Sequence, residues 1–197
     1  MLVTDDRLLG DRDLVTVCRD AEAGGVTSIQ VRLKHVQSRH MLSQVRAVMH
    51  AVRIPVLVND RLDVAVAAGA AGVHLGPDDL PVPLARRIVP VGFWLGASVG
   101  QEAEVPGGAA ADYWGIGPVR STSTKSDAGD AIGVSGFERL CRSSSPNQPC
   151  VAIGGIRPED VAPLLGAGAA GVAVGSGILA SDDVHAAAAK YRGALPP

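Results

Sequence analysis

The chain contains GAAGVHLG at residues 69–76 and repeats it with two changes as GAAGVAVG at residues 168–175. In each copy, the glycines and alanines predict the end of a helix and a tight turn, and the residues that follow predict a short strand that ends at a glycine. Such units are expected where similar strand–helix modules recur, although Gly-Ala turns also resemble one another by chance. The repeat predicts a fold of successive strand–helix modules.

Segments of the same kind recur along the whole chain and alternate with segments of helical spacing. Strands are predicted at residues 2–4, 28–31, 55–58, 72–75, 93–97, 113–116, 150–153 and 171–174. The helical spacing is weakest around residues 101–105, where Pro106 ends the pattern. Eight strands that alternate with about eight helices predict an α/β fold, a (β/α)8 TIM barrel with residues 1–197 as a single domain. A doubly wound open sheet, built from the same elements, is the structural alternative.

Composition agrees with a buried parallel sheet. Apolar residues form 47% of the 197 residues and aromatic residues 3%, so the core consists of Val, Ile, Leu and Ala. The net charge of -2 gives no indication of binding to nucleic acid or to an anionic membrane. Three cysteines, an odd count without metal-ligand spacing, favour a reducing compartment, so the expected location is the cytoplasm. No signal peptide or membrane-spanning run is visible.

The ends of the strands carry the chemistry, because active sites of TIM barrels lie at the carboxyl-terminal ends of their strands. The second strand leads into Gln30, Arg32 and Lys34, which alternate with apolar residues and therefore share one face. If that face looks into the mouth of the barrel, an amide and two cations converge on an anion. The alternative is an edge strand that turns this face to solvent.

Aspartates follow the next two strands. Asp60 comes directly after the third strand, and Asp78 and Asp79 follow the fourth, so one carboxylate from each strand end is predicted to share one Mg²⁺, a hard cation that prefers oxygen ligands. Each aspartate could instead cap the helix that follows it. Together with Lys34 and Arg32, the predicted metal indicates a diphosphate.

Hydroxyls, a lysine and glycines follow the remaining strands. Ser98 ends the fifth strand, and the sixth opens into GPVRSTSTK at residues 117–125, which contains Thr122, Thr124 and Lys125. Gly155 follows the seventh strand, and Gly175 and Ser176 follow the eighth. Glycine-rich loops after the last two strands are the usual phosphate site of a TIM barrel. The sequence thus predicts two anion sites in one mouth.

The chain offers no clear general base or nucleophile. His74 lies within the fourth strand among apolar residues and is interpreted as a packed structural histidine. A carboxylate or cysteine base at a strand end, as a phosphosugar isomerase of this fold would need, is not evident. These observations favour a reaction driven by stabilisation of a leaving group.

In these motifs and in their order, the whole chain resembles the thiamine-phosphate synthase family. The resemblance rests on residues 30–34, 58–61, 72–79, 117–125, 153–156 and 175–176. It implies an enzyme, a transferase of thiamine biosynthesis, that joins 4-amino-2-methyl-5-(diphosphooxymethyl)pyrimidine to a thiazole phosphate and releases diphosphate. In the family the C–O bond breaks first, and the thiazole nitrogen captures the pyrimidinylmethyl cation.

The resemblance also implies roles for individual residues. The pyrimidine diphosphate would be held by Gln30, Arg32, Lys34 and Asn59. Asp60 and Asp79 would ligate Mg²⁺, Ser98 would contact the pyrimidine, and Lys125 would contact the diphosphate. The thiazole phosphate would lie against Thr122, Thr124, Gly155, Gly175 and Ser176. Arg32, Lys34, Ser98 and Lys125 would act in catalysis. Leu33, Arg120 and Ser121 differ from the residues that are common in the family at these positions.

Two other functions fit the same fold. A thiazole tautomerase would not need the full set of diphosphate and metal residues, and a non-catalytic barrel that binds a phosphorylated ligand would need only the glycine loops. The presence of Lys34, Asp60, Asp79 and Lys125 favours the synthase. The expected partners are small-molecule substrates, and the sequence leaves open whether the chain forms a homo-oligomer.

Overall fold

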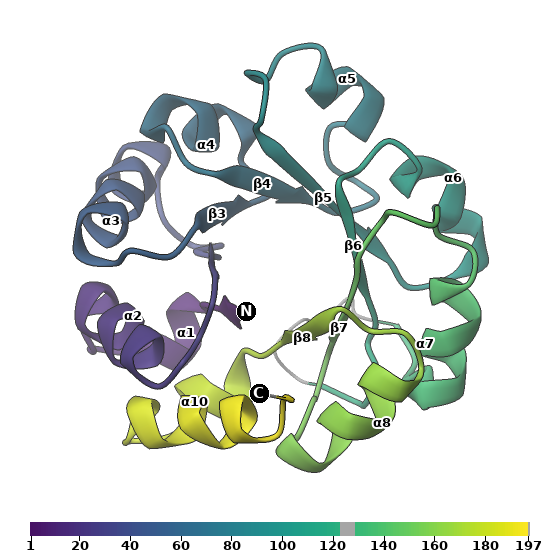
Figure 1. The fold of residues 1–197 in the computed structure, drawn as a ribbon. Helices are drawn as coiled ribbons and strands as arrows, with labels where there is room; N and C mark the ends of the chain where they lie inside the picture. The colour runs from purple at the N-terminus through teal and green to yellow at the C-terminus, as the bar shows by residue number, and fades with distance from the viewer. Residues whose placement is uncertain (123–128, 197) are drawn as a thin grey trace.

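The computed structural model describes residues 1–122 and 129–196 and contains eight parallel strands inside a ring of helices (Figure 1). The strands pair in the order in which they occur along the chain. They are β1 (Leu2–Val3), β2 (Ile29–Val31), β3 (Val56–Asn59), β4 (Gly72–Leu75), β5 (Trp94–Val99), β6 (Tyr113–Ile116), β7 (Cys150–Ile153) and β8 (Gly171–Ala173).

The sheet closes between its first strand and the end of its last. Leu2 pairs in parallel with Val174. The N–H of Val3 donates to the carbonyl of Val174 at 2.9 Å, and the N–H of Val174 donates to the carbonyl of Met1 at 3.0 Å. Within the described residues every strand therefore has a neighbour on both sides. The TIM barrel is confirmed, and the open doubly wound sheet is wrong.

Helices cover the outside of the barrel (Figure 1). They are α1 (Asp6–Leu9), α2 (Leu14–Ala23), α3 (Ser38–Ala51), α4 (Leu62–Ala68), α5 (Val82–Arg86), η1 (Glu102–Glu104), α6 (Val105–Gly108), α7 (Gly133–Cys141), η2 (Pro158–Asp160), α8 (Val161–Gly166), α9 (Ser176–Leu179) and α10 (Val184–Gly193). The segment around residues 101–105, where the helical pattern is weakest, forms only the short 3-10 turn η1 and the single turn α6.

Local sequence explains how these elements begin and where they pack. The carboxylate of Asp13 accepts the N–H of Thr16 at 2.8 Å and so caps α2. From there Leu14, Val17 and Cys18 fall on one buried face of the helix. Strands β2, β3 and β4 are buried throughout, as expected where a parallel sheet is covered on one face by helices and filled on the other by side chains.

The ends of the strands position the site. Strand β2 stops at Val31, so Arg32 and Lys34 stand in the loop beyond the strand rather than on it. β2 pairs with β1 on one side and β3 on the other, which makes the edge-strand interpretation wrong. Strand β5 runs two residues further than predicted, to Val99, and carries Ser98 at its end. Among the described residues, no helix is long and apolar enough to cross a membrane.

Candidate active site

A cavity of about 610 Å³ opens where the strands end. The predicted site residues that line it are Gln30, Arg32, Lys34, Asn59, Asp60, Asp79, Ser98, Thr122, Gly155, Gly175 and Ser176. They lie at the carboxyl-terminal ends of β2 to β8 or in the loops that follow these strands. Thr124 and Lys125 lie outside the described residues. The fold thus brings together, in one cavity, every predicted site residue that the structure describes.

Arg32 is held from the end of β1. Its guanidinium forms an ion pair with the carboxylate of Asp5, which is 6% exposed. The backbone N–H of Arg32 also donates to the hydroxyl of Thr4 at 2.8 Å. Asp5 in turn accepts the N–H groups of Arg7 and Leu8, each at 3.1 Å, at the start of α1. The Arg32 guanidinium is therefore fixed at the wall of the cavity by a buried carboxylate.

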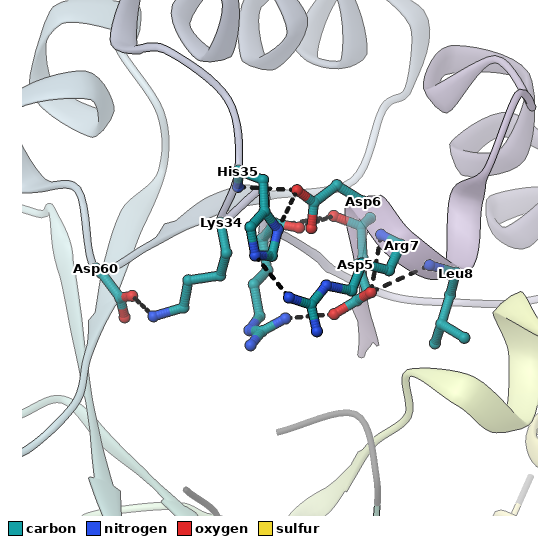
Figure 2. A network of polar contacts seen from close by, with 9 residues as sticks. Asp5, Asp6, Arg7, Leu8, Lys34, His35 and Asp60 are labelled. Carbon is teal, nitrogen blue, oxygen red and sulfur yellow. Dashed lines mark hydrogen bonds and ion pairs between the residues drawn. The ribbon is translucent and has the colours of Figure 1, made fainter. Parts of the chain in front are cut away.

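A second contact between the same two loops surrounds His35 (Figure 2). Its N–H donates to Asp6 at 2.9 Å, and its Nδ1 lies 2.8 Å from the same carboxylate oxygen. Nη2 of Arg7 lies 3.0 Å from Nε2 of His35. Burial works to raise the pKa of Asp6, but the hydrogen bonds from His35 outweigh it and hold this pKa below its ordinary value. The loop that carries Lys34 is thus tied to α1.

Asp60 extends toward Lys34, and the two side chains form an ion pair (Figure 2). Asp60 has a φ of 62°, the left-handed region that residues other than glycine seldom adopt. Such backbone strain is retained when its surroundings enforce it and is frequent at functional sites. Helix α4 has Arg61 at its N-cap without a side-chain cap, so the interpretation of Asp60 as a helix cap is wrong.

Asp79 folds back onto its own loop. Its Oδ2 accepts the N–H of Gly76 at 2.7 Å, whereas α5 begins after Pro81 without a side-chain cap. Asp79 therefore does not cap the helix. Burial raises the pKa of Asp79, and the nearby Asp60 carboxylate raises this pKa further, while the Gly76 N–H and Lys34 act in the opposite direction. Two carboxylates thus face each other across a partly buried site.

This pair of carboxylates suits a magnesium ion in its donor chemistry. Among the residues that the structure describes, no three His, Cys, Asp or Glu side chains group closely enough to hold a metal without help. Mg²⁺ is commonly bound by one or two carboxylates, with water and substrate phosphates as its other ligands. A cation between Asp60 and Asp79 would also relieve the repulsion that raises the pKa of Asp79. The residues present fit the ion.

His74 links Ser98 to Tyr113 at the floor of the cavity. Its Nε2 lies 3.0 Å from Oγ of Ser98, and its Nδ1 lies 3.0 Å from the hydroxyl of Tyr113. The Tyr113 hydroxyl also bonds Gln30, and burial raises the pKa of this hydroxyl above its ordinary value. His74 is only 7% exposed, yet it lines the cavity. The histidine therefore packs as predicted and also orients the hydroxyl of a predicted site residue.

The loops after β6 and β7 meet backbone to backbone. A Cβ on Gly117 would lie 2.1 Å from the carbonyl oxygen of Ile153, and a Cβ on Gly154 would lie 2.5 Å from Cβ of Pro118. Gly155 also has a φ of 63°, which glycine adopts at no steric cost. Glycine is required here because any side chain would push the two loops apart. Gly117, Gly154 and Gly155 also line the cavity, so the backbone itself forms this part of its wall.

Some residues that shape the cavity were not anticipated from the sequence. Asp5 comes shortly after β1, separated from it by Thr4, so the rule of strand ends applied to the first strand would have found it. Tyr113 stands at the other end of its strand, and its partnership with His74 depends on the register of β5 with β6. Nothing in the local sequence marks Tyr113.

Comparisons with known proteins agree with this geometry. A family model described as thiamine monophosphate synthase matches residues 1–178. The chain is 44% identical over 192 residues to a thiamine-phosphate synthase of Azorhizobium caulinodans, covering 95% of this chain and 90% of that one. It is also 44% identical over 196 residues to the corresponding protein of Methanoculleus marisnigri, covering 97% and 92% of the two chains.

Solved structures give the same result. A thiamine phosphate pyrophosphorylase from Pyrococcus furiosus superimposes with a TM-score of 0.85 at 34% identity, covering 98% of this chain and 93% of that one. A 3-hexulose-6-phosphate synthase superimposes with a TM-score of 0.72 at 17% identity, covering 99% of each chain, and at that identity it shows the fold alone.

Proposed function

The chain belongs to the thiamine monophosphate synthase family and is a transferase of thiamine biosynthesis, and from this premise we propose how its cavity makes thiamine phosphate. The substrates are 4-amino-2-methyl-5-(diphosphooxymethyl)pyrimidine and a thiazole phosphate, and the second product is diphosphate. The observation that carries the proposal is that cationic, acidic and glycine-rich loops meet in one cavity. Residues 1–197 act as one catalytic domain.

The diphosphate binds on the side formed by the loops after β2, β3 and β4. Lys34 and Arg32 supply positive charge, and Gln30 and Asn59 supply amide donors. Asp60 and Asp79 would hold Mg²⁺, which would supply positive charge to stabilise the diphosphate as a leaving group. Lys34, which is paired with Asp60 in the structure, then turns to the diphosphate.

The reaction needs little from the protein beyond position and charge. The C–O bond between the pyrimidine methylene and the diphosphate breaks, and its electron pair leaves with the diphosphate. The thiazole nitrogen then forms a C–N bond to the methylene carbon. Ser98, whose hydroxyl is oriented by His74 at 3.0 Å, contacts the pyrimidine ring while positive charge develops on it. No general base is required because the attacking nitrogen carries a lone pair and loses no proton.

The thiazole phosphate binds on the opposite side, against the loops after β6, β7 and β8. Gly155, Gly175 and Ser176 offer backbone N–H groups, and the first turn of α9 has donors that no helical carbonyl accepts. Thr122 offers a hydroxyl from the cavity wall. The family resemblance assigns Thr124 to the thiazole phosphate as well and assigns Lys125 to the diphosphate.

Release of diphosphate tests this proposal. The purified protein is given both substrates, each substrate alone, and both substrates with Mg²⁺ removed by a chelator. We expect release only when both substrates and Mg²⁺ are present. Asp60→Asn is expected to lose this activity, whereas the matched variant Asp63→Asn keeps it, because Asp63 pairs with Arg61 on the surface. Equal activity of the two variants contradicts the metal role.

The same assay separates the alternatives. A folded protein that binds the thiazole phosphate without releasing diphosphate would be a tautomerase or a binding protein, and conversion between thiazole forms would distinguish these two.

We propose the cytoplasm as the location, since its reducing conditions suit the three free cysteines. The partners are the two small-molecule substrates, without nucleic acid or membrane, and the proposal holds for a monomer or a homo-oligomer.

A further inference from the structure

An arginine behind the cavity wall pairs with an aspartate 40 residues further along the chain. Arg120 lies in the loop after β6, and Asp160 ends the 3-10 turn η2 after β7. Nε of Arg120 donates to Oδ2 of Asp160 at 2.8 Å, and Nη2 donates to Oδ1 at 2.6 Å. This two-point pairing fixes the direction of the guanidinium as well as its distance.

The Asp160 side chain is nearly buried and is held by several hydrogen bonds. Its side chain is 9% exposed, against 44% for Arg120. The same carboxylate also accepts the N–H of Arg157 at 2.9 Å. The Arg120 hydrogen bonds hold the pKa of Asp160 below its ordinary value despite its burial. The carboxylate is therefore ionised near neutral pH and anchored to the turn after β7 on one side and to the loop after β6 on the other.

The two loops that this pair connects touch along their backbones. The N–H of Arg120 donates to the carbonyl of Gly154 at 2.9 Å, and the N–H of Val119 donates to that of Ile153 at 2.9 Å. A Cβ on Gly155 would lie 2.8 Å from Cβ of Arg120 and 2.9 Å from the carbonyl oxygen of Ser121. A small displacement of Arg120 therefore moves the backbone beside Gly155.

Both loops reach the cavity immediately beyond this contact. Gly154 and Gly155 line it from the β7 side, and Thr122 lines it from the β6 side. The Arg120–Asp160 pair stands behind this part of the wall. The residues around Lys34, Asp60 and Asp79 lie on loops that the pair does not contact, so its effect is confined to one side of the cavity.

We propose that Arg120 and Asp160 are positioning residues that set the spacing between the Thr122 and Gly155 loops and thereby the affinity for the thiazole phosphate. The inference rests on the proposed function, because it assigns the thiazole phosphate to these loops. It adds that recognition of this substrate depends on an ion pair that does not touch it. Binding of the pyrimidine diphosphate does not depend on the pair.

Steady-state kinetics of Arg120→Met test the proposal, since this change leaves the bond from Arg157 to Asp160 intact. We expect KM for the thiazole phosphate to rise on the order of tenfold, as contacting charged pairs couple by an amount of this size. KM for the pyrimidine diphosphate should change by less than about twofold. Arg120→Lys keeps the charge but not the two-point geometry, so it should fall between the wild type and Arg120→Met.

Two controls make the result specific. Arg142→Met removes a more exposed guanidinium from an ion pair with Glu138 on α7 and should leave both KM values unchanged. In Asp160→Asn, the Arg120→Met change should have little further effect, because the partner is already lost. Additive effects of the two substitutions, or an equal rise of both KM values, would overturn the proposal.

The outcome also distinguishes the inference from the proposed function. If the wild type makes thiamine phosphate and folded Arg120→Met has the KM of the wild type, only the positioning role fails. If the wild type releases no diphosphate but binds thiazole phosphate in calorimetry, the Kd of Arg120→Met must rise by the same factor, or the positioning role fails. A folded wild type that neither reacts with nor binds thiazole phosphate overturns both.

Discussion

Gly96→Ala should damage the floor of the cavity. Gly96 is buried in β5, and a Cβ there would lie 2.3 Å from Cζ of Tyr113, 2.4 Å from its hydroxyl and 2.5 Å from Nδ1 of His74. All three distances are shorter than any carbon contact in a relaxed core, so both rings must move. Overpacking of this kind costs about 1–3 kcal/mol of unfolding free energy. In a chain of this size, each kcal/mol lowers Tm by about 2–4 °C.

The displaced rings also change binding. His74 loses its 3.0 Å contact with Ser98, so the serine hydroxyl is no longer held toward the pyrimidine. A lost hydrogen bond is worth about 1 kcal/mol, and we expect KM for the pyrimidine diphosphate to rise by roughly fivefold. KM for the thiazole phosphate should stay near its wild-type value.

Thermal unfolding and steady-state kinetics measure both effects. Gly166→Ala in α8 is the matched control, because a Cβ there would meet no atom within 4 Å. The control should be neutral or more stable by about 0.4–1 kcal/mol. If Gly96→Ala matches Gly166→Ala in Tm and in both KM values, the reasoning on the His74 contact is refuted.

Three further predictions concern the charged residues. Asp79→Asn should lower Mg²⁺-dependent turnover by about a hundredfold or more, because a metal supplies several kcal/mol of charge stabilisation. It should also raise Tm at pH 7 without metal, since a carboxyl whose pKa is raised by folding destabilises the fold above its unfolded pKa; a lower Tm speaks against this. The rise in wild-type Tm on adding Mg²⁺ should shrink as the pH falls, because the pKa of Asp79 is raised and a proton on its carboxyl competes with the ion; a rise independent of pH excludes Asp79 as a ligand. Lys125→Ala should lose about 2–4 kcal/mol of transition-state stabilisation in kcat/KM, and an unchanged kcat/KM removes Lys125 from the mechanism.

The positions of the strands could be predicted because a parallel barrel leaves a simple pattern. Its strands are buried on both faces, so they appear as short apolar runs between helices. The strands predicted at 72–75, 113–116 and 150–153 have the observed bounds of β4, β6 and β7. Since all eight strands point the same way, the residues that follow them had to share one end of the barrel.

The partners of these residues could not be predicted in the same way. Arg32 pairs with Asp5 and Arg120 with Asp160, across 27 and 40 residues of chain. Which side chains meet at such separations depends on loop conformation, and neither periodicity nor spacing encodes it. The sequence placed His74 in the core, but its contact with Ser98 required the pairing of β4 with β5.

Formation of thiamine phosphate by the purified protein tests the central claim most directly. The protein is incubated with the pyrimidine diphosphate, the thiazole phosphate and Mg²⁺, and both products are measured by chromatography and mass spectrometry. We predict thiamine phosphate and diphosphate in equal amounts, with neither product formed when Mg²⁺ is chelated. A folded protein that binds both substrates and forms no thiamine phosphate would contradict the claim.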